Sequence, residues 1–504
     1  MPPAADLAQR SITAALWGAS GALAQLVLQF GIQVVLARLL GPEQYGLFAL
    51  AAVVIGLASF LTFGVASGLI QKRTVTDEDV RFVNFFQCMI GGAVAAVVFL
   101  LADSAAAFFQ EPRVAPVIHA LAAACLIQAL AAISGGLLSR DLDFKTVQLA
   151  QIVSYVVGYG MVGIPLAARG YGVDALVAAF LVQAVLALAL QYARRRHVLG
   201  FVHWHGDAAW LCRYGVTASA THINNWVLAQ LSRVVVGRMF VSAAVGLYAL
   251  PFNLTAQLAG AVTAVQAPLF SAGSRVQDDL PRLRNLFLTM LAATAMLAAP
   301  LFAGIAAAPH TVMLALYGGD WLESAPLVRP FALGMPFYIA TMMGTPMLWN
   351  SGRTTHELKY QLPIVFVLGL AAYLAALHSL AAVAWAVFGI FVLRFVVITR
   401  AASAALGLGI GELAAAFRPG VAVSAAVAGA IALVDSLATH ITQQPQLALA
   451  ADIVTGLVVQ AIALRLVQPW LSAEMRALAE KLLARLPQPL APFGGALLAL
   501  RRRA

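Results

Sequence analysis

Charged residues are scarce in this sequence. Asp, Glu, Lys and Arg together make up 10% of its 504 residues, whereas an ordinary soluble domain carries about 25%. Apolar residues make up 62% of the chain, and the mean hydropathy is +0.88. A soluble core cannot hide this much apolar surface, so the composition indicates a protein whose solvent is largely lipid. In lipid every backbone polar group needs an internal partner, which leaves helices or closed barrels.

Cysteine is also scarce, and its spacing excludes two kinds of site. The three cysteines, Cys88, Cys125 and Cys212, lie far apart in or beside apolar segments. This pattern indicates neither a disulfide framework nor a metal site. The first apolar segment runs on to Leu40 without a cleavage site, so we interpret it as a retained helix rather than a signal peptide. No nucleophile–base pair or phosphate-binding glycine motif stands out, so we expect no enzyme and no cofactor.

Carboxylates are nearly absent from the interior of the apolar runs. Asp and Glu fall in loops or at helix ends, and Asp174 and Asp452 come closest to the interior, near predicted helix starts. A proton or sodium antiporter for cationic compounds is expected to hold an acidic residue deep in the membrane. The shortage therefore favours an anionic substrate, and it leaves open whether a proton or sodium ion is coupled.

Long apolar runs are what the sequence has in abundance. They are roughly 20 residues long and continuous, as membrane-spanning helices are. We therefore predict an all-α integral membrane protein with about fourteen spans, or twelve if the last pair does not cross. The predicted spans are 14–40, 44–70, 83–102, 115–138, 147–168, 173–192, 214–240, 243–269, 286–308, 326–349, 361–377, 380–400, 417–435 and 449–467.

Basic residues fall mainly in alternate loops. One set of loops holds Lys72, Arg140 and the run 194–196, whereas the opposite set holds little beyond Arg113 and Arg169. Lys and Arg mark the cytoplasmic side of a membrane protein, so both termini are predicted to be cytoplasmic. This topology explains most of the net charge of +10 without a nucleic-acid partner.

The chain repeats itself with an offset near 200 residues. Residues 34–50 read VVLARLLGPEQYGLFAL and residues 234–250 read VVVGRMFVSAAVGLYAL, with seven identities and no gap. The loop DEDVRFVNFF at 77–86 likewise resembles DDLPRLRNLF at 278–287. Duplicated helical bundles are a recurring plan of transporters, with the substrate held between the halves. Six spans per repeat is an even number, so the two copies enter the membrane in the same direction.

These observations predict four parts. Residues 1–200 form an N-terminal six-helix lobe with its linker, and residues 201–402 form a pseudo-symmetric second lobe. Residues 403–468 form helices 13 and 14. From Trp470 onward apolar and basic residues follow opposite faces of a helix, so residues 469–504 are predicted to be an amphipathic basic tail on the cytoplasmic surface.

The segments LARLLGPEQYGLFAL at 36–50 and GVASGLIQKRTVTDEDV at 64–80 resemble the opening of the Wzx-type polysaccharide flippases. These belong to the MOP superfamily, which also holds the MATE antiporters and the lipid II flippases. The resemblance implies two six-helix lobes around a cavity that opens alternately to each side of the bacterial inner membrane. It implies an undecaprenyl-diphosphate-linked oligosaccharide as substrate. Polymerase or export partners are implied by the family and not by any residue.

Polar residues on two repeat-related helices are the first candidates for a substrate cavity. Gln25, Gln29 and Gln33 recur every fourth residue and share one helical face. In the second repeat Gln25 corresponds to Asn225 and Gln33 to Arg233. Interhelical hydrogen bonding is the alternative role for such residues. The candidate residues on these two helices are Gln25, Gln29, Gln33, His222, Asn225 and Arg233.

Arg233 is the candidate for holding a diphosphate, because a guanidinium grips phosphate oxygens in a bidentate fork. The alternative is that it extends to the membrane surface, the role we favour for Arg38 and Arg238. Arg81 and Arg282, with neighbouring Asn84 and with Asn253, are further candidates for contact with the headgroup. The cytoplasmic placement of their loops also explains Arg81 and Arg282 without any contact with the headgroup.

Two other functions remain as alternatives to the flippase. A MATE-type multidrug antiporter is disfavoured by the missing interior carboxylates. A membrane-embedded polysaccharide polymerase or ligase is expected to display a large external loop with catalytic residues, and the predicted map contains none.

Overall fold

The computed structural model describes residues 4–72, 74–198, 200, 206–273, 279–350 and 354–470. Throughout these ranges the chain is helical and forms no strand, which confirms the predicted all-α class. The predicted basic tail lies almost entirely in residues 471–504, outside the described residues.

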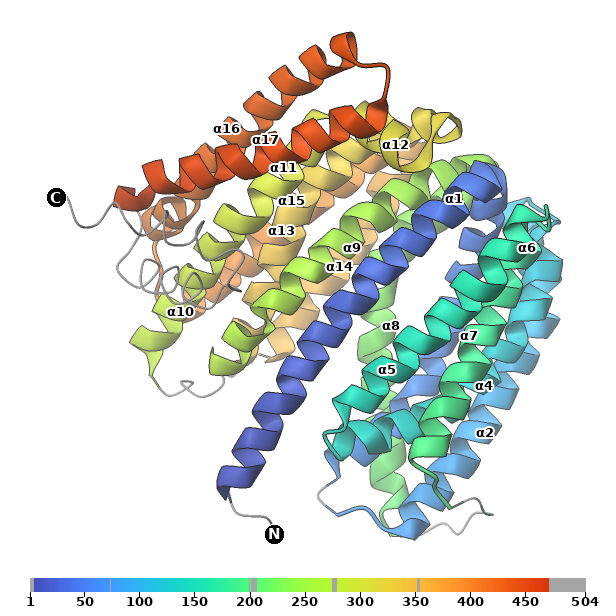
Figure 1. Ribbon diagram of the computed structural model, residues 1–504. Helices are drawn as coiled ribbons and strands as arrows, with labels where there is room; N and C mark the ends of the chain where they lie inside the picture. Colours follow the sequence, from blue (N-terminus) through green and yellow to red (C-terminus); the bar gives the residue numbers. More distant parts are fainter. Residues whose placement is uncertain are drawn as a thin grey trace. The chain divides into compact units, whose positions relative to one another are not determined.

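The first helix, α1 (Ala4–Gln71), changes direction at Gly41 (Figure 1). Gly41 has φ +70° and ψ 175°, a conformation that glycine adopts far more readily than other residues. The following Pro42 has no amide hydrogen with which to continue a helix. The two segments of α1 lie where the sequence predicted spans 14–40 and 44–70.

The helices that follow α1 are connected by short turns. Thr76 caps α2, because its hydroxyl accepts from the Asp79 amide at 3.2 Å while the Asp79 carboxylate accepts from the Thr76 amide at 2.8 Å. The helices up to residue 273 are α2 (Asp77–Leu100), α3 (Ala102–Phe109), α4 (Val114–Arg140), α5 (Phe144–Tyr155), the π-helical η1 (Val156–Gly163), α6 (Ile164–Ala168), α7 (Val173–Arg194), α8 (Ala208–Met239) and α9 (Ser242–Gly273).

The C-terminal half has the same all-helical construction. Its helices are α10 (Leu280–Ala293), the π-helical η2 (Thr294–Ala298), α11 (Ala299–Ala307), α12 (Pro309–Tyr317), the short η3 (Gly319–Ser324), α13 (Ala325–Asn350), α14 (Thr354–Ala376), α15 (Leu380–Leu406), α16 (Ile410–Ile441), α17 (Pro445–Leu466) and η4 (Gln468–Trp470). The short helices α3, α12 and η3 were not predicted from the sequence.

Eleven helical segments in the described ranges are long and apolar enough to cross a membrane. The candidate Ser20–Ser59 covers the predicted span 14–40 in part and the first residues of the predicted span 44–70. The predicted spans 214–240 and 326–349, in α8 and α13, have no candidate among the described residues and stay predictions. The chain is therefore a multi-pass membrane protein by length and composition of its helices, with eleven spans in place of the predicted fourteen meeting this criterion.

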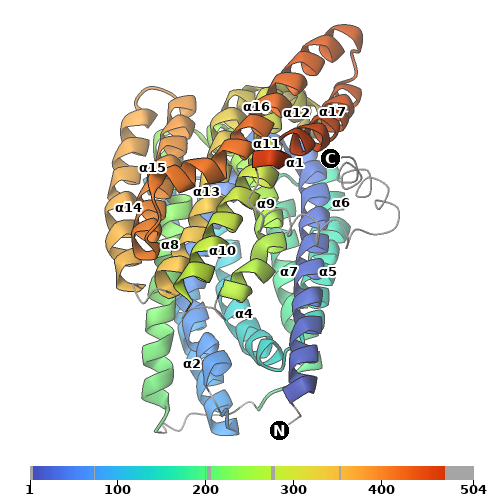
Figure 2. The same ribbon diagram turned by 90° about the vertical axis from the view of Figure 1, so that its left-hand side faces the viewer.

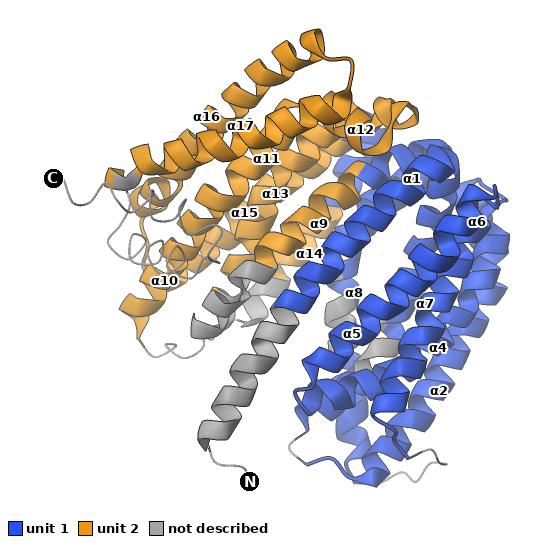
Figure 3. Cartoon of the chain, viewed as in Figure 1, with its two compact units in different colours: residues 1–250, 368–383 blue, residues 251–367, 384–504 orange. Residues whose placement is uncertain are grey.

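Contacts divide the chain into two compact units (Figure 3). Unit 1 comprises residues 1–250 and 368–383, and unit 2 comprises residues 251–367 and 384–504. Helix α8 belongs to unit 1 because it packs along the second segment of α1. A Cβ on Gly215 of α8 would lie only 2.9 Å from the Cα of Val65. The lobes predicted at 1–200 and 201–402 follow the sequence repeat and remain a prediction.

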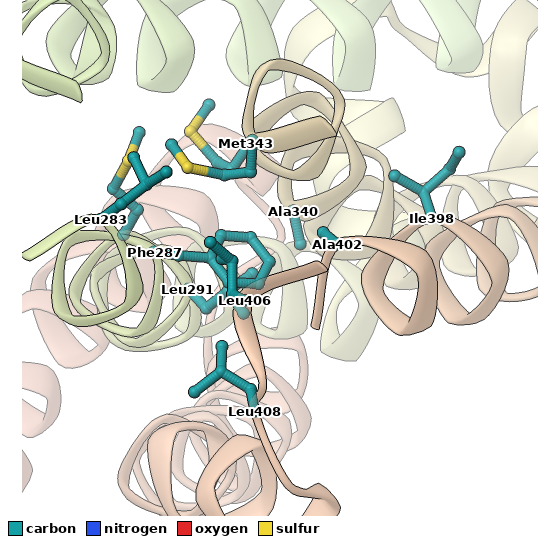
Figure 4. Packing of buried hydrophobic residues seen from close by; sticks show 11 residues of the cluster. Leu283, Phe287, Leu291, Ala340, Met343, Ile398, Ala402, Leu406 and Leu408 are labelled. Atoms are coloured by element: carbon teal, nitrogen blue, oxygen red, sulfur yellow. The ribbon is translucent and has the colours of Figure 1, made fainter. Parts of the chain in front are cut away.

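Each unit has its own apolar core. In unit 1, Leu69, Phe82, Val83 and Leu211 are almost completely buried in one cluster, and α1, α5 and α7 lie side by side (Figure 2). In unit 2, α10, α13 and α15 contribute Phe287, Ala340, Ile398 and their neighbours to a second cluster (Figure 4). These cores hold the polar residues of each unit in defined positions.

Candidate functional site

The predicted glutamine stripe on α1 becomes more buried toward the turn at Gly41. Gln25 and Gln29 are half-buried, whereas Gln33 is only 9% exposed. The Gln33 Nε2 donates a 2.8 Å hydrogen bond to the hydroxyl of Tyr45. This bond joins the two segments of α1 across the turn, so Gln33 is held by the protein rather than facing lipid.

Arg233 lies inside α8 and is 8% exposed. Its guanidinium is within electrostatic reach of the hydroxyls of Tyr45 and Tyr248. Gln33 and Arg233 occupy equivalent positions of the two repeats, so both repeats direct a polar side chain toward Tyr45.

Two other arginines near Arg233 behave differently. Arg38 and Arg238 are both exposed, and the guanidinium carbon of Arg238 lies 5.9 Å from the centre of the Phe108 ring. An arginine that extends to a membrane surface keeps its charged group accessible. The burial of Arg233 argues against that arrangement, and the exposure of Arg38 and Arg238 agrees with it.

Two tyrosines lie beside Tyr45 in the same part of unit 1. The rings of Tyr155 and Tyr159 stack on each other with centroids 4.7 Å apart and an angle of 24°, and both are within electrostatic reach of Tyr45. Tyr159 is buried and Tyr155 is half-buried. Only Tyr155 therefore retains an accessible ring surface on which a sugar can stack.

The two repeats meet at a pair of equivalent glycines. A Cβ on Gly46 would lie 1.8 Å from the carbonyl oxygen of Ser242, and a Cβ on Gly246 would lie 2.0 Å from that of Pro42. Pro42 and Ser242 are themselves equivalent in the repeat. Each repeat thus presents a glycine to the backbone of the other, and no larger side chain fits at either position. The contact defines a local two-fold axis within unit 1.

An ion cluster lies next to this glycine contact. Arg113 contacts Glu43 at 2.6 Å and Glu111 at 2.8 Å, and its Nη2 donates to the Ser242 hydroxyl at 3.4 Å. The hydrogen bonds from Arg113 lower the pKa of Glu111, because they favour the charged form of the carboxylate. The cluster therefore ties the loop before α4 to both repeats.

A cavity of about 380 Å³ lies within unit 1, between α1, α4, α5 and α7. Four glutamines line it, from three different helices, and amides of this kind can hydrogen-bond sugar hydroxyls. The Gln128 oxygen already accepts from the Ser59 hydroxyl at 2.8 Å. Sequence reasoning missed the two glutamines on α7, although their spacing of eight residues places them on one helical face. The four are Gln128, Gln151, Gln183 and Gln191.

The remaining predicted residues are not gathered at Tyr45. Arg81 is exposed and Asn84 half-buried in the first turns of α2. Arg282 is exposed and pairs with Asp279 at 3.1 Å, and Asn253 is half-buried in unit 2. His222 and Asn225 belong to α8, but their side chains lie outside the described residues.

Two buried ionisable residues were missed or misplaced by the sequence reading. Arg394, in the middle of α15, is 7% exposed. The sequence feature that could have identified it is its position as the one arginine inside the apolar run 380–400, before Arg400 at its end.

Asp452 is 3% exposed on the second turn of α17. Asp452, one of the two carboxylates expected closest to the membrane interior, lies about one turn deeper in its helix than predicted, because α17 begins at residue 445 rather than 449. Asp174, in contrast, is exposed in the first turn of α7.

Solved structures identify the fold. The chain is similar to the lipid II flippase MurJ in its inward closed conformation, with a TM-score of 0.67 at 15% identity over 90% of this chain and 98% of that one. An inward-facing MATE multidrug transporter gives a TM-score of 0.63 at 15% identity over 77% and 98% of the two chains. The chain is thus a helical membrane protein that shares the fold of these two proteins.

Sequence relatives identify the family. Residues 35–326 match the model of the polysaccharide biosynthesis protein family, so the chain belongs to that family, and the resemblance seen at 36–50 is confirmed. The lipopolysaccharide biosynthesis protein WzxC of Escherichia coli (strain K12) is 24% identical over 330 residues, 64% of this chain and 66% of its own.

The succinoglycan biosynthesis transport protein ExoT of Rhizobium meliloti (strain 1021) is 26% identical over 309 residues, 61% of this chain and 62% of its own. The chain therefore spans slightly less than two thirds of the length of these two relatives. The teichuronic acid biosynthesis protein TuaB of Bacillus subtilis (strain 168) is 22% identical over 416 residues, 79% and 83% of the two chains.

Proposed function

We propose that this protein is a flippase of the bacterial inner membrane. Its substrate is an oligosaccharide repeat unit linked to undecaprenyl diphosphate, and its product supplies a surface or secreted polysaccharide. The printed names of the relatives, which refer to lipopolysaccharide biosynthesis and succinoglycan transport, support this assignment. In this proposal both termini are cytoplasmic, fourteen helices cross the membrane, and two six-helix lobes alternate in opening.

The observation that carries the proposal is the buried Arg233 beside Tyr45. A charged, sugar-bearing headgroup can cross hydrocarbon only where the protein replaces its hydration, because unpaired burial of charge costs several kcal/mol or more. An arginine buried inside a membrane helix is itself unfavourable and marks a substrate or ion path. Arg233 neutralises the diphosphate, and the phenol of Tyr45 supplies a neighbouring hydrogen bond.

The sugars occupy the amide-lined cavity of unit 1. Gln128, Gln151 and Gln183 offer both donors and acceptors to hydroxyl groups, and the half-buried Tyr155 offers an aromatic ring for stacking. The glycine contact at Gly46 and Gly246 closes one end of the route, and its separation opens that end. By the predicted topology the closed end is external.

The lipid-linked sugar pool tests this function. In cells lacking the protein, a complete undecaprenyl-diphosphate-linked repeat is expected to accumulate while polymer is lost, and its mass identifies the substrate. Arg233→Gln at normal membrane level is expected to reproduce this accumulation. Arg238→Gln is the matched control, because Arg238 lies on the same helix but is exposed, and it is expected to support export. Full export by Arg233→Gln would overturn the assignment of Arg233.

A MATE-type antiporter is the second candidate, favoured by the buried carboxylate Asp452. It predicts an unchanged lipid-linked pool and greater sensitivity to cationic drugs in cells without the protein. The same measurement therefore separates the two functions. A polymerase or other export component remains a proposed partner of the flippase.

A further inference from the structure

A carboxylate is buried in an apolar groove of unit 2. Asp452 of α17 is 3% exposed, and no described residue donates a hydrogen bond to either of its carboxylate oxygens. The groove has a volume of about 130 Å³ and is lined largely by Pro, Leu, Ile and Val side chains of α11, α12, α16 and α17. An isolated ionised carboxylate in such surroundings is strongly unfavourable, so a ligand that removes charge would stabilise the site.

A second carboxylate faces Asp452 from the neighbouring helix. Asp435 of α16 lies within hydrogen-bonding reach of Asp452, and its Oδ1 accepts a hydrogen bond from the Thr311 hydroxyl of α12. Val427, Ile431 and Asp435 are spaced by four residues and therefore share the face of α16 that lines the groove. The two carboxylates thus meet between α16 and α17, with Thr311 beside them.

The helices approach closely around this pair. A Cβ on Gly304 of α11 would lie 2.7 Å from the Ile431 Cδ1, and a Cβ on Gly456 of α17 would lie 3.1 Å from the same atom. Ile431 is one turn from Asp435, and Gly456 is one turn from Asp452. This packing, visible as the adjacent α11, α16 and α17 of Figures 1 and 2, brings the helices that carry the two carboxylates close together.

The other ionisable groups on the surrounding helices point elsewhere. His310 of α12 and His440 of α16 are exposed. Arg418 of α16 stacks on Trp470, with its guanidinium carbon 4.5 Å from the ring centre. Arg465 of α17 lies more than three turns beyond Asp452. No Lys, Arg or His belongs to the described lining of the groove, so that lining supplies no counter-charge to Asp452.

The number of oxygen atoms selects the ligand. Hard metal cations such as Mg²⁺ and Ca²⁺ take about six or more oxygen ligands. The described lining of the groove offers one carboxylate, Asp452, and one amide, Gln460. Outside that lining, Asp435 reaches Asp452 and accepts the hydrogen bond of Thr311, so the described oxygens are few. A proton needs only one oxygen from each carboxylate, and two carboxylates in contact share a proton because both cannot remain charged. We propose that Asp435 and Asp452 form a proton-binding site in which one proton is shared in an O–H···O hydrogen bond.

Proton occupancy would control the packing of α17 on α16. Loss of the proton leaves two negative charges facing each other across an apolar groove, and their repulsion separates the helices. By the predicted topology, the loop between α16 and α17 is external, so the site exchanges protons with that side. The site stands independently of the flippase proposal.

Infrared spectroscopy of the purified full-length protein in lipid tests the site directly. Wild-type protein is expected to show a carboxylic-acid carbonyl band near neutral pH that disappears on titration to alkaline pH. Asp452→Asn is expected to abolish this band. Asp320→Asn is the control, because Asp320 is an exposed carboxylate of the same unit, and it should leave the band unchanged. Absence of the band in wild type, or its persistence in Asp452→Asn, would overturn the proposal.

Two further measurements keep the test decisive. If Asp452→Asn does not reach the membrane, Asp435→Asn replaces it, and removal of the partner oxygen is expected to shift the band. An unshifted band would contradict proton sharing. Thermal unfolding in sodium or potassium chloride of equal ionic strength should show no difference. Stabilisation by sodium that Asp452→Asn removes would identify a metal-ion site instead and overturn the proton assignment.

Discussion

Two buried carboxylates, Asp79 of unit 1 and Asp452 of unit 2, lie in opposite electrostatic surroundings. In unit 1, the enclosed carboxylate of Asp79 contacts the Lys72 ammonium at 2.5 and 2.6 Å, and Arg233 lies among phenol hydroxyls. In unit 2, Asp435 is the charged group that reaches Asp452 among the described residues, and it is another carboxylate. A charge compensated by the protein stabilises one arrangement of helices. Around a charge without such compensation, the packing of the helices depends on whether a ligand binds the charge. The surroundings of Asp79 therefore suit a fixed packing of helices, and those of Asp452 suit a packing that changes with a bound ligand.

The largest effect is expected from breaking the compensated pair of unit 1. Lys72→Met removes the ammonium that contacts the carboxylate of Asp79, which is 0% exposed. The loss is expected to be about 3–5 kcal/mol, measured as a lower midpoint of thermal unfolding. Burial alone would lower the pKa of Lys72, but hydrogen bonds to Asp207 and Asp79 raise it above its ordinary value. The stabilisation is therefore fully present at neutral pH and lost only as pH rises through the raised value.

Two controls sharpen this test. Asp207 is the other partner of Lys72, and the Asp207 side chain is 64% exposed. Asp207→Asn is therefore expected to lower the free energy of unfolding by less than about 1 kcal/mol. Adding Asp79→Asn to Lys72→Met removes the buried charge and should restore part of the stability. If the double variant is no more stable than Lys72→Met, burial of an unpaired charge is not the cause.

The next largest effect concerns the contact between the repeats. Gly46→Ala places a Cβ 1.8 Å from the carbonyl oxygen of Ser242 unless the backbone moves. The substitution is expected to lower the free energy of unfolding by about 1–3 kcal/mol. Because the contact is symmetric, Gly246→Ala should cause a similar loss of thermal stability and of polymer export. Gly31→Ala is the control on the same helix, because nothing lies within 4 Å of its Cβ position. A large difference between Gly46→Ala and Gly246→Ala would contradict the local two-fold axis.

A smaller effect is expected at the phenol that both repeats approach. Tyr45→Phe removes the acceptor of the Gln33 hydrogen bond and should cost about 0.5–1.5 kcal/mol. A double-mutant cycle with Gln33→Leu measures how much of this loss belongs to the bond. Additive losses in the cycle would show that Gln33 and Tyr45 do not stabilise each other.

The smallest effect is expected at the ion cluster beside the glycines. Arg113 is 54% exposed, so Arg113→Gln should cost only about 0.2–1 kcal/mol. Hydrogen bonds from Arg113 lower the pKa of Glu111 from its ordinary value of 4.5. The stabilisation is thus present above that value and lost as pH falls through the lowered one. Unfolding measured against pH should show wild type and variant converging in acid, and a constant difference would contradict this origin.

Periodicity indicated which faces of two helices are turned inward, while the role of these residues as a site stays a prediction. The four-residue spacing of Gln25, Gln29 and Gln33 placed them on one face, and the structure buries that face progressively toward Gly41. The burial of Arg233 agrees with the predicted inward position. Asp452 was misjudged because a four-residue error in the start of α17 moved it one turn toward the surface. Arg394 was overlooked because the run around it is otherwise apolar.

The sequence by itself determined the membrane class, the helical architecture, the duplication and the family. Composition, periodicity and repeated motifs can all be seen along the linear sequence, without knowledge of how the helices pack. Only the tertiary structure decided that Gly46 touches the Ser242 backbone, that Gln33 and Arg233 converge on Tyr45, and that Asp435 reaches Asp452. Such contacts depend on how helices pack and rotate about their axes. A shift of one residue turns a side chain by about 100°, and no local pattern specifies that rotation.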